Sequence, residues 1–312
     1  MLESALNEIL DEARGFLHLG KVTDCVPELA KANPDHLGVC VITTKGECFH
    51  AGDWELRFTM QSIAKTITLI LALKAAGEQE VFSGAGMEPV GETFNSFAKL
   101  DKSPIPSNPM INAGAISTAA CCVKYIKDPY KEFLDLARKL CGCNDIALDF
   151  DVYLSTKETG KRNRALAYIM EDSKILKCDA ESAVDFYDKT CSAIVNTKAL
   201  AFYAMLLANN GRNPVTGEEV VEGKIISTVK AIMLTCGMYN ASGEFAVRVG
   251  MPAKSGVGGG IIACAENRMG IATFGPAVDG AGNSVGGYII MEKLSHTLGL
   301  HLFSGDLHRV KV

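Results

Sequence analysis

The pattern of apolar and polar residues predicts a helix and a hairpin at the start of the chain. Apolar side chains recur at helical spacing across residues 2–17, which favours an amphipathic helix that ends near Gly20. Residues 21–36, with prolines at positions 27 and 34, are expected to be irregular. Residues 37–44 are typical of a strand, Lys45 and Gly46 of a turn, and residues 47–52 of the returning strand.

A helix that is apolar on nearly every side is predicted next, from Phe58 to Leu73. A helix without a polar face is expected to run through a core rather than over a surface. This helix contains Ser62 and Lys65, and residues three apart lie on the same helical face. The Ser62 hydroxyl and the Lys65 amine are therefore expected to lie within reach of each other.

From about residue 77 to residue 240, the pattern predicts helices separated by polar loops, and few strands. The expected helices cover residues 113–125, 130–140, 164–170, 180–187 and 197–208. Residues 209–214 are typical of a turn that closes the last helix. Asn112 is expected to cap a helix, and residues 158–163 are expected to form a loop before one.

Strands are predicted again after residue 240. The expected strands cover residues 246–249, 261–265 and 269–274, with Tyr239 in a turn before the first of them. A loop is expected at residues 275–282. The final helix is expected to run from Ser284 to about Leu302, with inward side chains at Val285, Ile289, Leu294 and Leu298.

Strands and terminal helices thus occur at both ends of the sequence, with a helical block between them. The economical arrangement is a single domain over residues 1–312 of the α+β class, with one antiparallel sheet covered by helices. The sheet is expected to come from residues 1–76 and 241–312, and a helical subdomain from about residues 77–240. No internal repeat and no low-complexity segment is present.

The composition of the chain excludes some kinds of binding partner. The net charge is −5 and no long basic run occurs, which argues against nucleic acid as the main partner. No apolar run reaches the roughly 18 residues that span a bilayer, and the first residues do not resemble a signal peptide. The 11 cysteines and six histidines lack the spacing of zinc sites. A cytoplasmic protein with reduced cysteines and a small-molecule substrate is the expectation.

Ser62 and Lys65 are the first candidates for catalysis. A serine needs a base to act as a nucleophile, and a lysine kept neutral by burial can be that base. The structural alternative is a helix-start serine followed by a lysine that reaches water. The same spacing also occurs at Ser96/Lys99 and at Ser227/Lys230. Lys254-Ser255-Gly256, at the end of a predicted strand, matches the K-T-G element that accompanies Ser-x-x-Lys in penicillin-recognising enzymes.

An ordered set of motifs resembles the serine-dependent glutaminase family, which has the β-lactamase-like fold. The resemblance extends from Pro27 to the last helix. The motifs are Gln61-Ser62-x-x-Lys65, Asn108-Pro109-Met110-Ile111-Asn112-Ala113-Gly114-Ala115, Glu158-Thr159-Gly160-x-Arg162-Asn163, Cys236-Gly237-Met238-Tyr239 and Pro252-Ala253-Lys254-Ser255-Gly256-Val257. It implies hydrolysis of the side-chain amide of L-glutamine to glutamate and ammonia, without a metal or organic cofactor.

The resemblance also implies roles for individual residues. Ser62 would attack the amide, Lys65 would accept its proton, and Tyr239 would relay protons to ammonia and from water. The backbone N–H groups of Ser62 and Val257 would form the oxyanion hole. The amino-acid end of the substrate would be held by the three remaining positions, Asn112, Asn163 and Tyr187. A homodimer or homotetramer is the expected assembly.

Two positions depart from the family pattern. Cys25 stands where the family usually has a tyrosine, and Thr156 where it usually has a glutamate that pairs with the α-ammonium group. Losing a charged hydrogen bond costs about 1.5–3 kcal/mol, or roughly 10- to 150-fold in affinity. The preferred substrate is therefore either glutamine or a related amide without a free α-ammonium group. Alternatively, a neighbouring acid such as Glu158 takes over the ammonium contact.

Two other functions fit some of these residues. A penicillin-recognising hydrolase shares the Ser-x-x-Lys and Lys254-Ser255-Gly256 elements, but it would normally meet its substrate outside the cytosol. A catalytically inactive ligand sensor would explain the changes at Cys25 and Thr156. Acylation of Ser62 by a diazo-ketone would separate an enzyme from a sensor.

Overall fold

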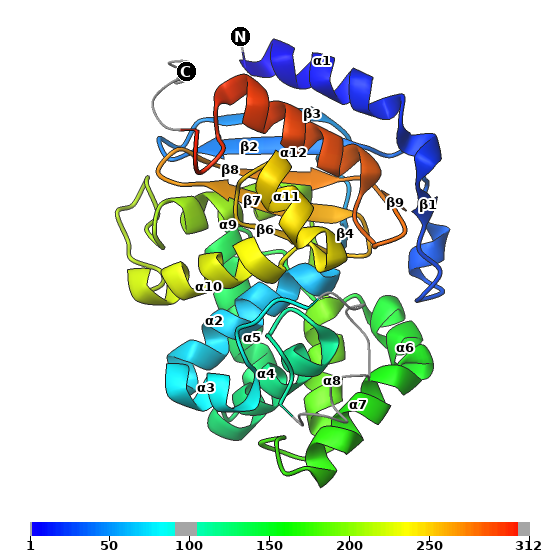
Figure 1. The fold of residues 1–312 in the computed structure, drawn as a ribbon, viewed down its shortest axis with the longest axis vertical. Helices are drawn as coiled ribbons and strands as arrows, with labels where there is room; N and C mark the ends of the chain where they lie inside the picture. The colour runs from blue at the N-terminus through cyan, green and yellow to red at the C-terminus, as the bar shows by residue number, and fades with distance from the viewer. Residues whose placement is uncertain (1, 91–104, 305–312) are drawn as a thin grey trace.

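A five-stranded antiparallel sheet forms the centre of the computed structural model, which describes residues 2–90 and 105–304. Its strands come from both ends of the chain, as the sequence predicts. Their order is β3 (Cys48–Gly52), β2 (Gly38–Thr43), β8 (Met269–Phe274), β7 (Gly260–Ala265) and β6 (Ala253–Ser255). Figure 1 shows the sheet in the upper half of the molecule and a group of helices below it.

Both faces of the sheet are covered, so its central strands are buried on each side. Val39 and Val41 of β2 face a core shared with α1 (Leu2–Arg14) and α12 (Val285–Leu298). Cys40 and Ile42 alternate with them and face the larger core of the helical part. This arrangement explains why the strands are nearly continuous apolar runs without polar alternation.

Helix α9 (Thr197–Ala208) crosses directly over the sheet and packs against β8, β7 and β2. The close approach requires Gly270 on β8, where an added Cβ would lie 1.9 Å from the backbone nitrogen of Met205. Glycine has no side chain and so permits backbones to approach this closely. Although α9 lies in the middle of the sequence, it therefore covers the sheet.

The remaining elements complete the fold around this sheet. The other helices are α2 (Ala64–Ala76), α3 (Glu78–Gly84), α4 (Asn112–Tyr125), α5 (Pro129–Cys141), α6 (Phe150–Thr159), α7 (Lys161–Asp172), α8 (Ala180–Cys191), α10 (Gly223–Cys236) and α11 (Ser242–Arg248). Short strands form two further pairs, β1 (Lys21–Val22) with β9 (Ala277–Val278), and β4 (Phe58–Thr59) with β5 (Ile194–Val195). Short 3₁₀ helices occur at η1 (Leu17–Leu19), η2 (Leu29–Lys31), η3 (Gln61–Ile63) and η4 (Tyr239–Ala241).

Five sequence predictions are wrong in detail. The helix expected from Phe58 begins only at Ala64, after strand β4 and the η3 turn. Asn112 is the first residue of α4 rather than its cap, which is Ile111, and the Asn112 side chain bonds Lys65 instead. Residues 246–249 do not form a strand, because they belong to α11 and the turn after it. Four residues are too few to distinguish the periodicity of a helix from that of a strand. The last helix ends at Leu298, where Gly299 adopts a left-handed cap, and two of its predicted inward residues, Val285 and Ile289, are only half-buried. Residues 158–163 are not a loop but the junction of α6 and α7, broken only at Gly160.

All 11 cysteines lie within the described residues and are free thiols. Among the helices of residues 2–90 and 105–304, none is long and apolar enough to cross a membrane. The division of the chain into a sheet part and a helical subdomain stays a prediction.

Candidate active site

Ser62 lies on the short turn η3 that joins β4 to α2. The residue before it, Gln61, is buried and has a φ of 48°, in the left-handed region. A non-glycine residue there costs roughly 1–2 kcal/mol, and such strain gathers at functional sites. The Gln61 side chain donates to Thr59 Oγ1 at 2.9 Å, which holds the turn and directs Ser62 at the start of the buried helix.

Lys65, one helical turn later, is buried and only 2% exposed. Its Nζ donates to Asn112 Oδ1 at 2.7 Å and to the Met110 carbonyl at 3.0 Å, and both acceptors are uncharged. Burial lowers the pKa of Lys65 to about 8. Removal of a lysine from water disfavours its charged form, so the neutral amine that a general base requires forms near pH 8 rather than above pH 10.

Tyr239 lies on η4, also with a left-handed φ, of 53°. Its hydroxyl interacts with the Ser62 side chain and with the Val257 backbone amide, while burial raises the pKa of the phenol. Lys254 Nζ lies 4.4 Å from the centre of the Tyr239 ring and donates to the carbonyls of Gly237 and Ser255. Burial, and after it the charge of Lys65, hold the pKa of Lys254 well below its usual range.

The end of β6 lies directly against the Ser62 turn. A Cβ added at Gly256 would lie 2.9 Å from the Met60 carbonyl oxygen and 3.5 Å from the Ser62 nitrogen. Only glycine allows this approach without displacing backbone. The Ser62 turn and Val257, the two predicted oxyanion-hole positions, are therefore close neighbours.

Asn112 connects the lysine to the predicted substrate-binding residues. Its Oδ1 accepts from Lys65 and, at 3.3 Å, from the Tyr187 hydroxyl, while its Nδ2 donates to Asn163 Oδ1 at 3.0 Å. These side chains come from α2, α4, α7 and α8. One amide thus fixes the geometry of groups from four helices.

A cavity of about 180 Å³ lies over these groups. It is lined by Cys25, Val26, Gln61, Ser62, Asn112, Thr156, Thr159, Gly160, Arg162, Asn163, Tyr187, Cys191 and Val257. The structure thus brings five predicted site residues together in one wall, with Lys65 and Tyr239 in contact with that wall. The two departures, Cys25 and Thr156, line the same cavity, whereas Glu158 is exposed on α6 and does not.

Several groups near this cavity are not predicted from the sequence. Arg162 and Cys191 line it, and Asp188 is buried directly behind it on α8. An aspartate one residue beyond a predicted helix end carries no signal of burial in the sequence. Its spacing of three residues from Cys191 is the one pattern that could have indicated a shared face.

The other Ser-x-x-Lys pairs do not resemble this arrangement. Ser227 is exposed on α10 and donates to the Gly223 carbonyl, and Lys230 pairs with Glu266 at 2.5 Å. Ser96 and Lys99 lie outside the described residues. Ser62 and Lys65 are thus the described pair that combines burial with a cavity.

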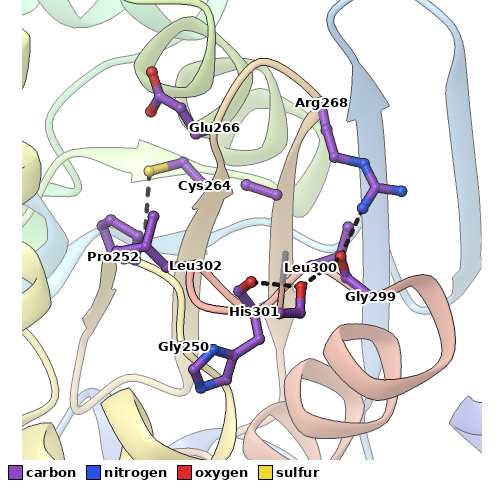
Figure 2. A pocket seen from close by; sticks show the side chains of 11 residues that line it. Gly250, Pro252, Cys264, Glu266, Arg268, Gly299, Leu300, His301 and Leu302 are labelled. Atoms are coloured by element: carbon purple, nitrogen blue, oxygen red, sulfur yellow. Dashed lines mark hydrogen bonds between the residues drawn. The ribbon is translucent and has the colours of Figure 1, made fainter. Parts of the chain in front are cut away.

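A second cavity, of about 330 Å³, lies beside the end of α12 and contains none of the predicted site residues (Figure 2). Its polar side chains have protein partners. Arg268 Nη1 donates to the carbonyls of Leu298 and Gly299, and His301 bonds the Val247 carbonyl. Within residues 2–90 and 105–304, no group of three or more His, Cys, Asp or Glu side chains could hold a metal ion.

Comparison with known proteins gives the same family by three routes. The family model described as "Glutaminase" matches residues 20–303. The chain is 48% identical to a glutaminase of Clostridium botulinum over 301 residues, which is 96% of this chain and 99% of the relative. It is 44% identical over 305 residues to "Glutaminase 2" of Clostridium perfringens, covering 97% and 100% of the two chains.

A solved structure agrees with the sequence comparison. The covalent complex of a Bacillus subtilis glutaminase with 5-oxo-L-norleucine, formed by reaction with 6-diazo-5-oxo-L-norleucine, matches with a TM-score of 0.87 at 34% identity. The match covers 97% of this chain and 100% of that chain. The predicted fold class is confirmed.

Proposed function

Because the chain belongs to the glutaminase family, we propose that it hydrolyses the side-chain amide of L-glutamine to L-glutamate and ammonia through an acyl-enzyme on Ser62. The observation that carries this proposal is the buried Lys65, whose pKa of about 8 provides a base beside the cavity that contains Ser62. The reaction makes the protein an amidohydrolase.

In the first half of the reaction, Ser62 Oγ attacks the side-chain amide carbon and passes its proton to the neutral Lys65. The tetrahedral intermediate then collapses, the C–N bond breaks, and Tyr239 delivers a proton to the departing ammonia. The ester to Ser62 and free ammonia are the products of this half. The hydroxyl of Tyr239 is suited to this relay because it already interacts with the Ser62 side chain.

In the second half, water attacks the ester carbon and gives a proton to the Tyr239 phenolate, which the first half left without its proton. Ser62 recovers its proton from the Lys65 ammonium as the C–O bond breaks and glutamate leaves. In both halves the negative oxygen would be stabilised by the backbone N–H groups of Ser62 and Val257, whose closeness follows from Gly256. One such donor contributes about 10²–10³ in rate.

The amino-acid end of glutamine would meet Asn112, Asn163 and Tyr187, which share one hydrogen-bond network. A second candidate substrate is a related amide without a free α-ammonium group. The observation that favours it is the presence of Thr156 and Cys25 in the cavity wall, where the family pattern has a glutamate and a tyrosine. We also propose a cytoplasmic homodimer or homotetramer, by resemblance to the family.

The test is ammonia release by purified protein from L-glutamine, N-acetyl-L-glutamine and glutaramic acid, which is glutamine without its amino group. We expect turnover of L-glutamine that is lost in Ser62→Ala and falls about 10²–10⁴-fold in Lys65→Met. Preference for either analogue over glutamine would support the second substrate class. Absence of turnover with all three would overturn the proposed activity and favour a ligand sensor.

A further inference from the structure

Asp188 is a buried carboxylate that has no hydrogen-bond partner among the described residues. It follows Tyr187 on α8 and is 1% exposed. Among the described residues, no donor reaches either of its oxygens. Buried polar groups are nearly always hydrogen-bonded, and an unpaired buried carboxylate is among the costliest exceptions. Such a group calls for a partner from outside the chain.

The carboxylate lies directly behind one wall of the active-site cavity. A Cβ built at Gly160, which lines the cavity, would lie 3.9 Å from Asp188 Oδ2. Asp188 Oδ2 therefore lies close to a residue of the cavity wall that has no side chain of its own. Tyr187 and Cys191, which also line the cavity, are both affected by the charge of Asp188.

A second orphaned acceptor lies on the facing helix. Thr156 Oγ1, from α6, is buried in the same cavity wall and also has no hydrogen-bond partner within residues 2–90 and 105–304. Helices α6 and α8 pack against each other. One unpaired hydroxyl therefore lies in the cavity wall, and one unpaired carboxylate lies beside Gly160 of the same wall, which also contains Asn112, Asn163 and Tyr187.

The surrounding cations do not neutralise Asp188. A Cβ added at Gly160 would lie 3.8 Å from Arg164 Nη1 of α7, so this guanidinium is close to Asp188. The Nε atom of Arg164 pairs with Glu181 at 3.6 Å. Lys157 of α6 pairs with Asp185 at 3.2 Å. Burial raises the pKa of Asp188 to about 7. The charges of Arg164 and Lys157 oppose that rise, and the like charges of Asp185 and Glu181 of α8 add to it.

We propose that Asp188 supplies the negative charge that pairs with the α-ammonium group of the substrate, with the Thr156 hydroxyl as a second acceptor. This role is the one that the resemblance assigns to a glutamate at position 156. The charge would thus come from α8 in this chain, while α6 keeps an uncharged acceptor. The inference rests on the proposed hydrolysis of glutamine and identifies what recognises the free amino acid.

The test compares Asp188→Asn with wild type on L-glutamine and on glutaramic acid. We expect the variant to raise KM for glutamine about tenfold or more, as for a lost charged hydrogen bond, and to leave kcat unchanged. KM for glutaramic acid should not change, because that substrate has no ammonium group. Adding Thr156→Glu to Asp188→Asn should recover most of the lost affinity for glutamine.

The matched control is Asp185→Asn on the same helix. Asp185 is already paired with Lys157, Lys189 and Tyr153, so its removal should leave both KM values unchanged at a pH well above 7, where Asp188 is ionised in either protein. A wild-type measurement supplies a second test that does not depend on folding of a variant. KM for glutamine should fall as pH rises through about 7 and Asp188 ionises, and KM for glutaramic acid should not follow it.

An equal rise of KM on both substrates, or no rise on either, would overturn the role of Asp188 and leave it a structural residue. These results would leave the glutaminase activity itself intact. If wild type releases no ammonia from either substrate and Ser62 does not react with a diazo-ketone, the proposed function fails and the inference fails with it.

Discussion

Replacing Asp188 with asparagine should raise the free energy of unfolding at alkaline pH. Burial raises the pKa of this carboxyl from its ordinary 3.8 to about 7 in the folded protein. Folding therefore favours the protonated form. The stability that the protonated Asp188 carboxyl contributes is fully present below the pKa that it has in the unfolded chain. This contribution is lost as pH rises through its pKa in the folded protein.

The magnitude follows from the two pKa values. Each pH unit between them corresponds to about 1.4 kcal/mol, so the full penalty at pH 8 is ~4 kcal/mol relative to strongly acidic conditions. Between pH 5 and pH 8 the penalty grows by ~3 kcal/mol, because the folded carboxyl titrates near pH 7. Asparagine keeps the shape and does not titrate, so the advantage of the variant should grow by that amount.

Urea unfolding of wild type and Asp188→Asn at several pH values between 5 and 8 measures this difference. The dependence of the unfolding free energy on urea concentration should be the same for the two proteins. Asp185→Asn is a control that should have the opposite effect on the free energy of unfolding. The lysines paired with Asp185 hold its pKa below the usual range despite its burial, so its removal should lower stability across this interval. Parallel curves for wild type and Asp188→Asn would refute the reasoning, since they would mean that Asp188 is ionised at no cost.

Three further predictions concern the reaction. The value of kcat/KM for glutaramic acid, which has no ammonium group, should rise with pH to a plateau above about 8, because Lys65 must be neutral; a flat profile would exclude it as the base. Gly256→Ala should lower kcat about 10²-fold in an ammonia assay, since its Cβ would lie 2.9 Å from the Met60 carbonyl and displace the Ser62 amide; full activity would contradict this packing. Tyr239→Phe should lower kcat by about 10²-fold or more, and an unchanged kcat would assign the proton relay to another group.

Much of the fold is predictable because its signals are local. The buried strands β7 and β8 are continuous apolar runs bounded by glycine and an Asn267-Arg268 turn, and α2 is apolar on every side. The failure at residues 246–249 has a local cause as well, since the end of the short helix α11 and the residue after it include two valines, a residue type common in strands. Periodicity cannot separate helix from strand over so few residues.

The site is only partly predictable, because its chemistry depends on tertiary burial. Ser62 and Lys65 follow from spacing, whereas the lowered pKa of Lys65 depends on its enclosure, where Met110 and Asn112 accept its hydrogen bonds. Asp188 is missed since it looks like a solvated residue at a helix end. Its burial arises only when α6, α7 and α8 assemble around Gly160.

The most direct test of the central claim, that Ser62 is the nucleophile and Lys65 its base, is peptide mapping after treatment with 6-diazo-5-oxo-L-norleucine. We expect one adduct, on Ser62, that is absent in Ser62→Ala and forms far more slowly in Lys65→Met. Loss of ammonia release should follow the adduct with equal stoichiometry. An adduct on another residue, such as Cys191 or Cys25 in the same cavity, with Ser62 unmodified, would contradict the account.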